Sequence, residues 1–174
     1  MGLDTVEIVL RWEASFGLSI ADADAMMLQT PRGAIDLIAK MLGAQDPPNS
    51  PCLTLRAFHC LRRGLAEAAG VARHRIRPTA RLKDLVRTKR HHVWLAVRSR
   101  SGLPSLPHLG WFSPHTVADL ARWTVLHAAT ELKRPGEPWT RSQIRTVVRA
   151  AVTDITGLEN FSDDDEFIRD LGLD

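Results

Sequence analysis

The residues of this chain that could do chemistry are an acidic run and a histidine pair. Residues 163–166 read Asp-Asp-Asp-Glu, and their carboxylates could hold a divalent cation. The run lacks the spacing of a calcium loop, so we expect solvated charge there. His91 and His92 are neighbours, and neighbours on a helix point about 100° apart. We expect exposed basic side chains at both positions and no metal site.

No nucleophile in the sequence stands in a catalytic setting. Ser99, Ser101 and Ser105 lie outside any Gly-x-Ser-x-Gly motif, and no glycine-rich phosphate loop precedes a helix. Cys52 and Cys60 match no metal spacing and are expected to be reduced, packed thiols. We therefore predict that the protein is not an enzyme.

The composition is that of a folded protein without a membrane span. The chain has 174 residues, 44% hydrophobic and 25% charged, enough for one ordinary domain or two small ones. No run approaches the ~20 apolar residues that cross a bilayer. The first residues carry acids where a secretory signal carries Lys or Arg, so a cytoplasmic location is expected.

Charge is distributed unevenly along the chain. Residues 1–50 hold three basic and seven acidic side chains, residues 51–140 sixteen and five, and residues 141–174 four and eight. Two acidic ends therefore flank a strongly basic middle. Such an asymmetry indicates segments with different partners.

The spacing of apolar residues predicts helices and no strands, hence an all-α fold. The predicted helices cover 4–17, 31–42, 54–69, 88–101, 115–133 and 140–156, with a linker at 43–51. Asp4 or Thr5 is expected to cap the first helix, and Thr30 the second. Trp94, Trp111 and Trp123 are expected in the core.

Two apolar stripes are expected to pack on each other. In the first helix the stripe is Val6, Val9, Leu10 and Phe16, and Ile35 and Ile38 extend it. In the last helix it is Ile144, Val147, Val148, Ala151 and Ile155. A helix pair of about 44 residues buries too little apolar surface to offset its ordering entropy, so the last helix should complete it.

The chain also repeats itself. An Asp-Leu pair follows a glycine-terminated helix at 81–86 and again at 166–172, and a threonine opens a helix at Thr30 and at Thr116. The chain therefore contains two copies of a helix, loop and Asp-Leu unit, and two copies of a unit in which a loop ends at a threonine that opens a helix.

The order of these motifs resembles the acyl carrier proteins. The chain ends in Asp-Leu-Gly-Leu-Asp at 170–174 and begins Gly-Leu-Asp-Thr-Val-Glu-Ile-Val at 2–9. Joined tail to head, 1–44 plus 139–174 resemble one acidic carrier module in circularly permuted order. Residues 52–134 resemble a degenerate basic copy in normal order. The resemblance implies two four-helix bundles, and the alternative is a single mixed bundle of all the helices.

The resemblance singles out Thr5. In carrier proteins a serine after Leu-Asp takes a phosphopantetheine, and here Thr5 follows Asp4 at the matching position. The β-methyl of threonine crowds its oxygen, and the transferases of this family use serine. We therefore expect no cofactor, with phosphopantetheine at Thr5 as the alternative.

The resemblance implies a non-enzymatic module in acyl or lipid metabolism that acts by protein–protein interaction. Four residues match the acidic face that carrier proteins present to enzymes, although a plain solvated face is an equal interpretation: Glu7, Glu13, Asp22 and Asp24. Basic residues replace the acidic motif in the central copy, among them Arg87, Lys89 and Arg90. They could bind an acidic carrier protein or the acidic module of this same chain.

The alternative function is a basic nucleic-acid-binding helical protein, because sixteen basic residues could follow a phosphate backbone. No zinc finger or recognition helix supports it, and the acidic ends would repel DNA.

The two ends could meet within one chain or between two chains. The linkers at 43–51 and 134–138 contain three and two prolines, which stiffen them. Stiff linkers disfavour a tight return, so we predict a homodimer that exchanges its C-terminal helices.

Overall fold

The computed structural model describes residues 2–46, 51–86, 90–108 and 114–173. These residues form eight α-helices and two 3₁₀ turns; within them, the extended pairing is limited to an isolated bridge between Arg81 and Thr116. The all-α prediction is confirmed. The α-helices are α1 (Leu3–Phe16), α2 (Asp22–Met27), α3 (Pro31–Met41), α4 (Leu53–Ala69), α5 (Leu82–Leu85), α6 (Arg90–Ser101), α7 (Val117–His127) and α8 (Arg141–Thr156).

The 3₁₀ turns are η1 (Arg73–Arg75) and η2 (Ala129–Leu132). Helices α2 and α5 were not predicted, and the helix expected over 115–133 is divided into α7 and η2. Across the described ranges, no helix is long and apolar enough to cross a membrane.

The chain divides into two compact units. Unit 1 consists of Met1–Ser50 and Arg134–Asp174, and unit 2 consists of Pro51–Lys133. Both ends of the chain therefore belong to unit 1. Unit 1 holds eight basic and sixteen acidic residues, whereas unit 2 holds fifteen and four.

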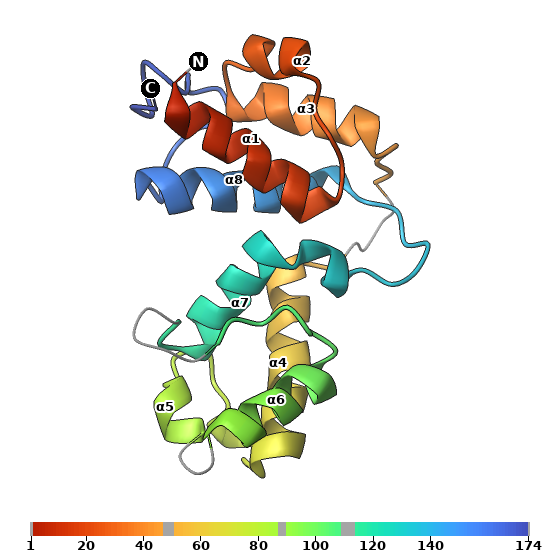
Figure 1. Ribbon diagram of the computed structural model, residues 1–174, viewed down its shortest axis with the longest axis vertical. Helices are drawn as coiled ribbons and strands as arrows, with labels where there is room; N and C mark the ends of the chain where they lie inside the picture. The colour runs from red at the N-terminus through yellow and green to blue at the C-terminus, as the bar shows by residue number, and fades with distance from the viewer. Residues whose placement is uncertain (1, 47–50, 87–89, 109–113, 174) are drawn as a thin grey trace. The chain divides into compact units, whose positions relative to one another are not determined.

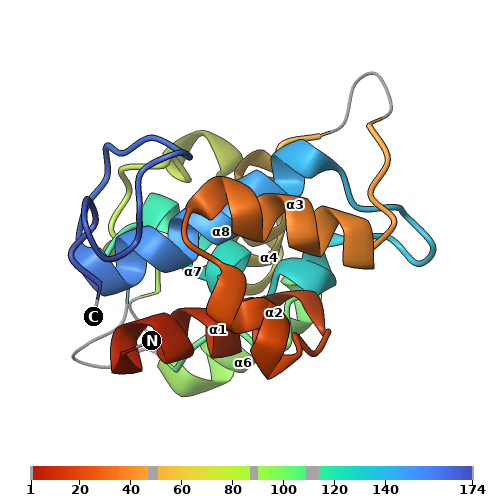
Figure 2. The same cartoon turned by 90° about the horizontal axis from the view of Figure 1, so that it is seen from above.

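In unit 1, α8 packs against both α1 and α3 (Figures 1 and 2). A capping box of Thr140 and Gln143 starts α8, and Gly157 ends it in the left-handed conformation. The predicted stripe of α8 is buried at Ile144, Val147, Val148 and Ala151; Ile155 is only half-buried, and Val152 is buried in addition. This stripe fills the space between α1 and α3.

The stripe predicted for α1 is confirmed at Phe16, which is buried, and is wrong at Val6 and Leu10; Val9 is half-buried. The buried face of α1 consists of Thr5, Ile8, Trp12, Ser15 and Phe16, whereas Val6 is 39% exposed and Leu10 is 57% exposed. Apolar side chains lie on two sides of this helix, so its periodicity is compatible with either face turned inward. Trp12 carries the largest apolar surface and is fully buried, and its burial fixes the rotation of the helix.

In unit 2, α4 packs against α6 and α7. Gly64 permits the close approach of α6, because a Cβ atom there would lie 2.8 Å from the carbonyl oxygen of Val97. Trp94 is buried as expected, and its Nε1 donates to the carbonyl of Pro107 at 2.7 Å. Trp123 is only half-buried, against the ring of His127, and Trp111 lies outside the described residues.

A specific pair of backbone hydrogen bonds holds the long loop of unit 1 to the start of α3. Thr30 is the N-cap of α3, and its Oγ1 accepts from Gly33 N. Just after the cap, Arg32 N donates to the carbonyl of Asp163 at 2.7 Å; just before it, the carbonyl of Gln29 accepts from Phe167 N at 2.9 Å. The two loop residues that make these hydrogen bonds, Asp163 and Phe167, are four apart in the sequence. Their bonds lie on either side of the N-cap of α3.

Unit 2 contains the same arrangement around the N-cap of α7. Thr116 caps that helix, Ala118 N donates to the carbonyl of Pro78 at 2.9 Å, and the carbonyl of His115 accepts from Leu82 N at 2.9 Å. The loop residues Pro78 and Leu82 are again four apart. In both units the loop follows a long helix, α4 here and α8 in unit 1. The capped helix comes after that long helix in the sequence of unit 2 and before it in the sequence of unit 1.

Candidate functional site: the exposed face of helix α1 and the position of Thr5

Thr5 lies inside α1 and not at its cap. The N-cap is Gly2, so the expectation that Asp4 or Thr5 caps the helix is wrong. The Oγ1 hydroxyl of Thr5 donates to the carbonyl of Gly2 at 2.8 Å, and the residue is only 8% exposed. Asp4 is half-buried in the first turn, where its negative charge is favourable for the helix dipole.

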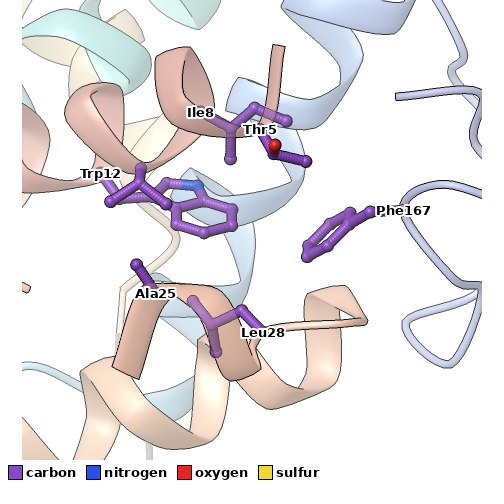
Figure 3. Close-up of a pocket in the computed structure, with 7 residues that line it drawn as sticks. Thr5, Ile8, Trp12, Ala25, Leu28 and Phe167 are labelled. Atoms are coloured by element: carbon purple, nitrogen blue, oxygen red, sulfur yellow. The ribbon is translucent and has the colours of Figure 1, made fainter. Parts of the chain in front are cut away.

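Thr5 lines a small apolar cavity between α1, α2 and the C-terminal segment (Figure 3). Ile8 and Trp12 line it from α1, Ala25 and Leu28 come from α2 and its C-cap, and Phe167 closes it from the C-terminal segment. The cavity measures about 10 Å³, which is room for about one water molecule. An acyl chain would therefore require the helices to move apart.

Trp12 Nε1 is buried without a hydrogen-bond partner, and it is the one side-chain nitrogen or oxygen of that kind in the described ranges. A buried donor without a partner costs about 1–3 kcal/mol. The indole lines the cavity, so a single water molecule is the partner that the space permits.

The opposite side of α1 exposes an apolar stripe. Leu3 is 84% exposed, and Val6 and Leu10 follow it at helical spacing. Glu7 stands beside the stripe and pairs with Arg11 at 2.7 Å. Val6 and Leu10, which periodicity assigned to the core, therefore lie on the surface together with Leu3 and Glu7. We call this surface the α1 face (Leu3, Val6, Glu7 and Leu10).

Glu13 does not belong to this face. It is half-buried, and its Oε1 accepts a hydrogen bond from Ile20 N at 2.6 Å. The carboxylate therefore fastens the loop after α1, which gives Glu13 a structural role in place of the expected exposed one.

Helix α2 adds acidic and apolar side chains. From the sequence, Asp22 and Asp24 were assigned to the acidic face, but this helix was not predicted, and Met26 and Met27 were not singled out. Asp22 and Asp24 are exposed in its first turn, and Met26 and Met27 are exposed in its second. The aspartates just before an apolar pair are a helix-start signal that could have revealed this element. A helix of six residues is too short for the spacing of its apolar side chains to reveal it.

The acidic run at 163–166 is an ion-pair site and not solvated charge. Asp163 is buried and receives hydrogen bonds from Arg145 and from Arg149, the latter at 2.7 Å. Burial alone would raise the pKa of Asp163, but the two guanidinium groups outweigh it and hold the pKa below its usual value. Asp164 pairs with Arg32 at 2.7 Å.

The described part of the chain contains no group of three or more His, Cys, Asp or Glu residues that could hold a metal ion. Both thiols are free, but Cys52 is exposed and Cys60 half-buried, so the expectation of packed thiols is wrong for Cys52. His91 and His92 are exposed, as expected, with ring centroids 5.9 Å apart.

The predicted basic binding residues lie at the boundary between two described ranges of the chain. Arg87 and Lys89 lie outside the described residues, and of Arg90 only the helical backbone is described, as the first residue of α6. Their part in binding stays a prediction.

Two plant carrier proteins match part of the chain. Acyl carrier protein 3, chloroplastic, of Cuphea lanceolata is 49% identical over 41 residues, which cover 24% of this chain and 29% of that protein. Acyl carrier protein 4, chloroplastic, of the same organism is 48% identical over 40 residues, which cover 23% and 29%.

No family model matches the chain, and no solved structure matches it significantly. The chain spans less than a third of the length of the curated relatives it matches. A stretch of about 40 residues of this all-helical chain is therefore similar to plant acyl carrier proteins.

Proposed function

We propose that unit 1 is an acyl-carrier-like interaction module of acyl metabolism that works without catalysis and without phosphopantetheine. The partial similarity to acyl carrier proteins and the all-helical fold support the family side of the proposal. The exposed α1 face is the observation that supports a role in protein–protein interaction.

An apolar stripe on a surface helix is typical of a helix that docks into a groove. Leu3, Val6 and Leu10 lie within three turns on one side of α1 and present their side chains to solvent. Glu7 adds a negative charge at the edge of the stripe. The matching partner is an acyl-metabolism enzyme with an apolar groove and basic residues at its rim.

The position of Thr5 supports the absence of the cofactor. A transferase must reach the hydroxyl oxygen that it modifies, whereas Thr5 is buried and its Oγ1 is hydrogen-bonded to the carbonyl of Gly2. A phosphodiester on this oxygen would place a charged group in an apolar cavity, which is strongly unfavourable.

For unit 2 we propose a degenerate copy of the same module. The paired backbone hydrogen bonds around Thr30 and Thr116 support a common origin of the two units. Its basic residues, with Arg87, Lys89 and Arg90 among them, fit an acidic protein surface, which includes another carrier protein.

In the described chain α8 packs on α1 and α3 of the same polypeptide. Exchange of α8 between two chains would use the same contacts, and the exchanged homodimer stays a prediction. The cytoplasmic location likewise stays a prediction.

A competition assay tests the proposed function. The full chain is added to purified acyl-transfer enzymes that act on a conventional acyl carrier protein, and the rate of transfer is measured. We expect competitive inhibition of at least one enzyme, and loss of inhibition when Leu3, Val6 and Leu10 are replaced by serine.

The matched control is Met41→Ser in the same unit, a half-exposed apolar residue outside the α1 face. It should inhibit as the unmodified chain does. Absence of competition against ketosynthases, acyltransferases and acyl-activating enzymes alike, or equal loss in the control, would show that the α1 face is not a docking surface.

A further inference from the structure

Unit 2 carries a cationic loop whose conformation is fixed by the protein itself. Residues 73–77 read Arg-His-Arg-Ile-Arg and follow α4. Ile76 is buried at 1% exposure and anchors the loop, whereas Arg73, His74, Arg75 and Arg77 are all exposed. We call this segment the arginine loop.

The guanidinium groups of two arginines form hydrogen bonds with the backbone of the arginine loop. Arg62 of α4 donates from Nε and NH2 to the carbonyl of Arg73, at 3.1 and 2.9 Å, and lies 6.0 Å from the ring centroid of Phe58. Arg77 donates from Nε to the carbonyl of His74 at 3.2 Å. The backbone of the loop is therefore preorganised, and the side chains of Arg73 and Arg75 are exposed.

The arginine loop forms no ion pair with the described part of its unit. Neither Arg62 nor the arginines at 73, 75 and 77 form an ion pair there, and unit 2 as a whole has only four acidic residues against fifteen basic ones. The positive charges of neighbouring arginines in this loop repel one another. An acidic partner would reduce this electrostatic repulsion.

Unit 1 offers the complementary surface. It has twice as many acidic as basic residues, and Asp22 and Asp24 are exposed together in the first turn of α2. No ion pair to either aspartate occurs among the described residues, in contrast to Asp163 and Asp164, which bind arginines. These two carboxylates are therefore available to a partner.

We propose that the arginine loop of one copy of this chain docks on the acidic start of α2 in a second copy. The contact is heterologous, because different surfaces meet, so it can repeat from copy to copy. The opposite charges of the two units favour this occupant. A nucleic acid is disfavoured as the partner, because unit 1 is acidic, belongs to the same chain and repels a phosphate backbone.

The experiment measures the mass of the full chain by sedimentation equilibrium at two ionic strengths. At about 10 mM the Debye length is about 30 Å, and at about 1 M it is about 3 Å. We expect the average mass to rise with concentration at low salt and to fall to a constant value at high salt. That value is 19.4 kDa for a single chain, or twice 19.4 kDa where α8 is exchanged.

Charge reversal identifies the surfaces. Arg73→Glu with Arg75→Glu reverses the loop, and Asp22→Lys with Asp24→Lys reverses α2; each pair should weaken self-association by about tenfold or more. A mixture of the two variants should associate again, because each reversed surface then meets a complementary one. Simple misfolding of either variant could not produce that recovery.

The matched control reverses two exposed charges elsewhere in unit 2, Lys83→Glu with Arg100→Glu. It should self-associate like the unmodified chain. Equal weakening in this control would assign the attraction to net charge and overturn the proposal. A chain that stays monomeric at low salt overturns it as well, and so does a dimer that ignores both salt and the variants, which would indicate exchange of α8.

Discussion

Trp12 of α1 and Phe167 of the C-terminal segment contact each other, with ring centroids 6.0 Å apart and ring planes at 43°. The two residues come from opposite ends of the chain and close one side of the small cavity together with Thr5 (Figure 3). The pair fastens the last turn of the chain to its first helix. Unit 1 therefore depends on both ends being present.

Phe167→Ala should destabilise unit 1 by about 3–5 kcal/mol, because the ring is buried and its removal leaves a cavity beside Trp12. Hydrogen exchange should show the loss in the amides of α1 and not in those of α6. Ile168→Ala is the control, since that neighbouring side chain is 67% exposed and should change stability by less than about 0.5 kcal/mol. A fully protected α1 in Phe167→Ala would contradict the dependence of unit 1 on this contact.

Co-expression with a broad-specificity phosphopantetheinyl transferase should leave the intact mass of the chain unchanged. Thr5→Ser should also stay unmodified, because the serine hydroxyl would occupy the same buried position next to the carbonyl of Gly2. Mass spectrometry of the intact protein measures both. A gain of one phosphopantetheine that disappears in Thr5→Ala would show that Thr5 is a working attachment site.

Stability of unit 1 should fall in acid through Asp163. Its pKa is lowered in the folded state, so its contribution is complete above the unfolded value of about 3.9 and is lost as the pH falls through the folded value. Asp163→Asn should cost about 1–3 kcal/mol at pH 7, because Arg149 and Arg145 lose a charged acceptor.

Urea unfolding between pH 7 and pH 2 measures this effect. The difference between the unmodified chain and Asp163→Asn should shrink toward zero at the acid end. Glu159→Gln, at an exposed carboxylate in the same loop, should follow the unmodified chain throughout. An Asp163→Asn curve parallel to the unmodified one at every pH would rule out Asp163 as the source of the acid sensitivity.

Truncation after Lys133 should unfold the remaining part of unit 1. Without α8, the buried faces of α1 and α3 lose the helix that covers them, and a helix pair of that size cannot offset its ordering entropy. Amides of α1 and α3 should exchange freely while those of α4 stay protected. Retained protection of α1 in the truncated chain would show that the two ends fold independently of each other.

Light scattering on the full chain should return a mass that separates a single chain from the exchanged dimer. We expect twice 19.4 kDa at any ionic strength if α8 is exchanged, because that contact is apolar and insensitive to salt. A monomer at high salt would exclude the exchange and leave the intramolecular pairing of α8 with α1 and α3.

Much of the helical content followed from the sequence, because local signals determine it. The threonines at 30 and 116 mark helix starts, and the glycines at 17, 70 and 157 mark helix ends, in the sequence as they do in the structure. The stripe of α8 was also predictable, because its apolar residues lie on one side only. Local hydrogen bonding and one-sided periodicity need no knowledge of the partner.

Only the tertiary structure decided which side of α1 is buried and what Thr5 and Asp163 do. Helix α1 has apolar residues on two sides, and the fit of Trp12 against Phe167 selects the inner one, leaving Leu3, Val6 and Leu10 to the surface. Asp163 became an ion-pair centre because α8 brings Arg145 and Arg149 to it. Contacts between residues distant in the chain depend on packing, which the sequence pattern of each segment alone does not contain.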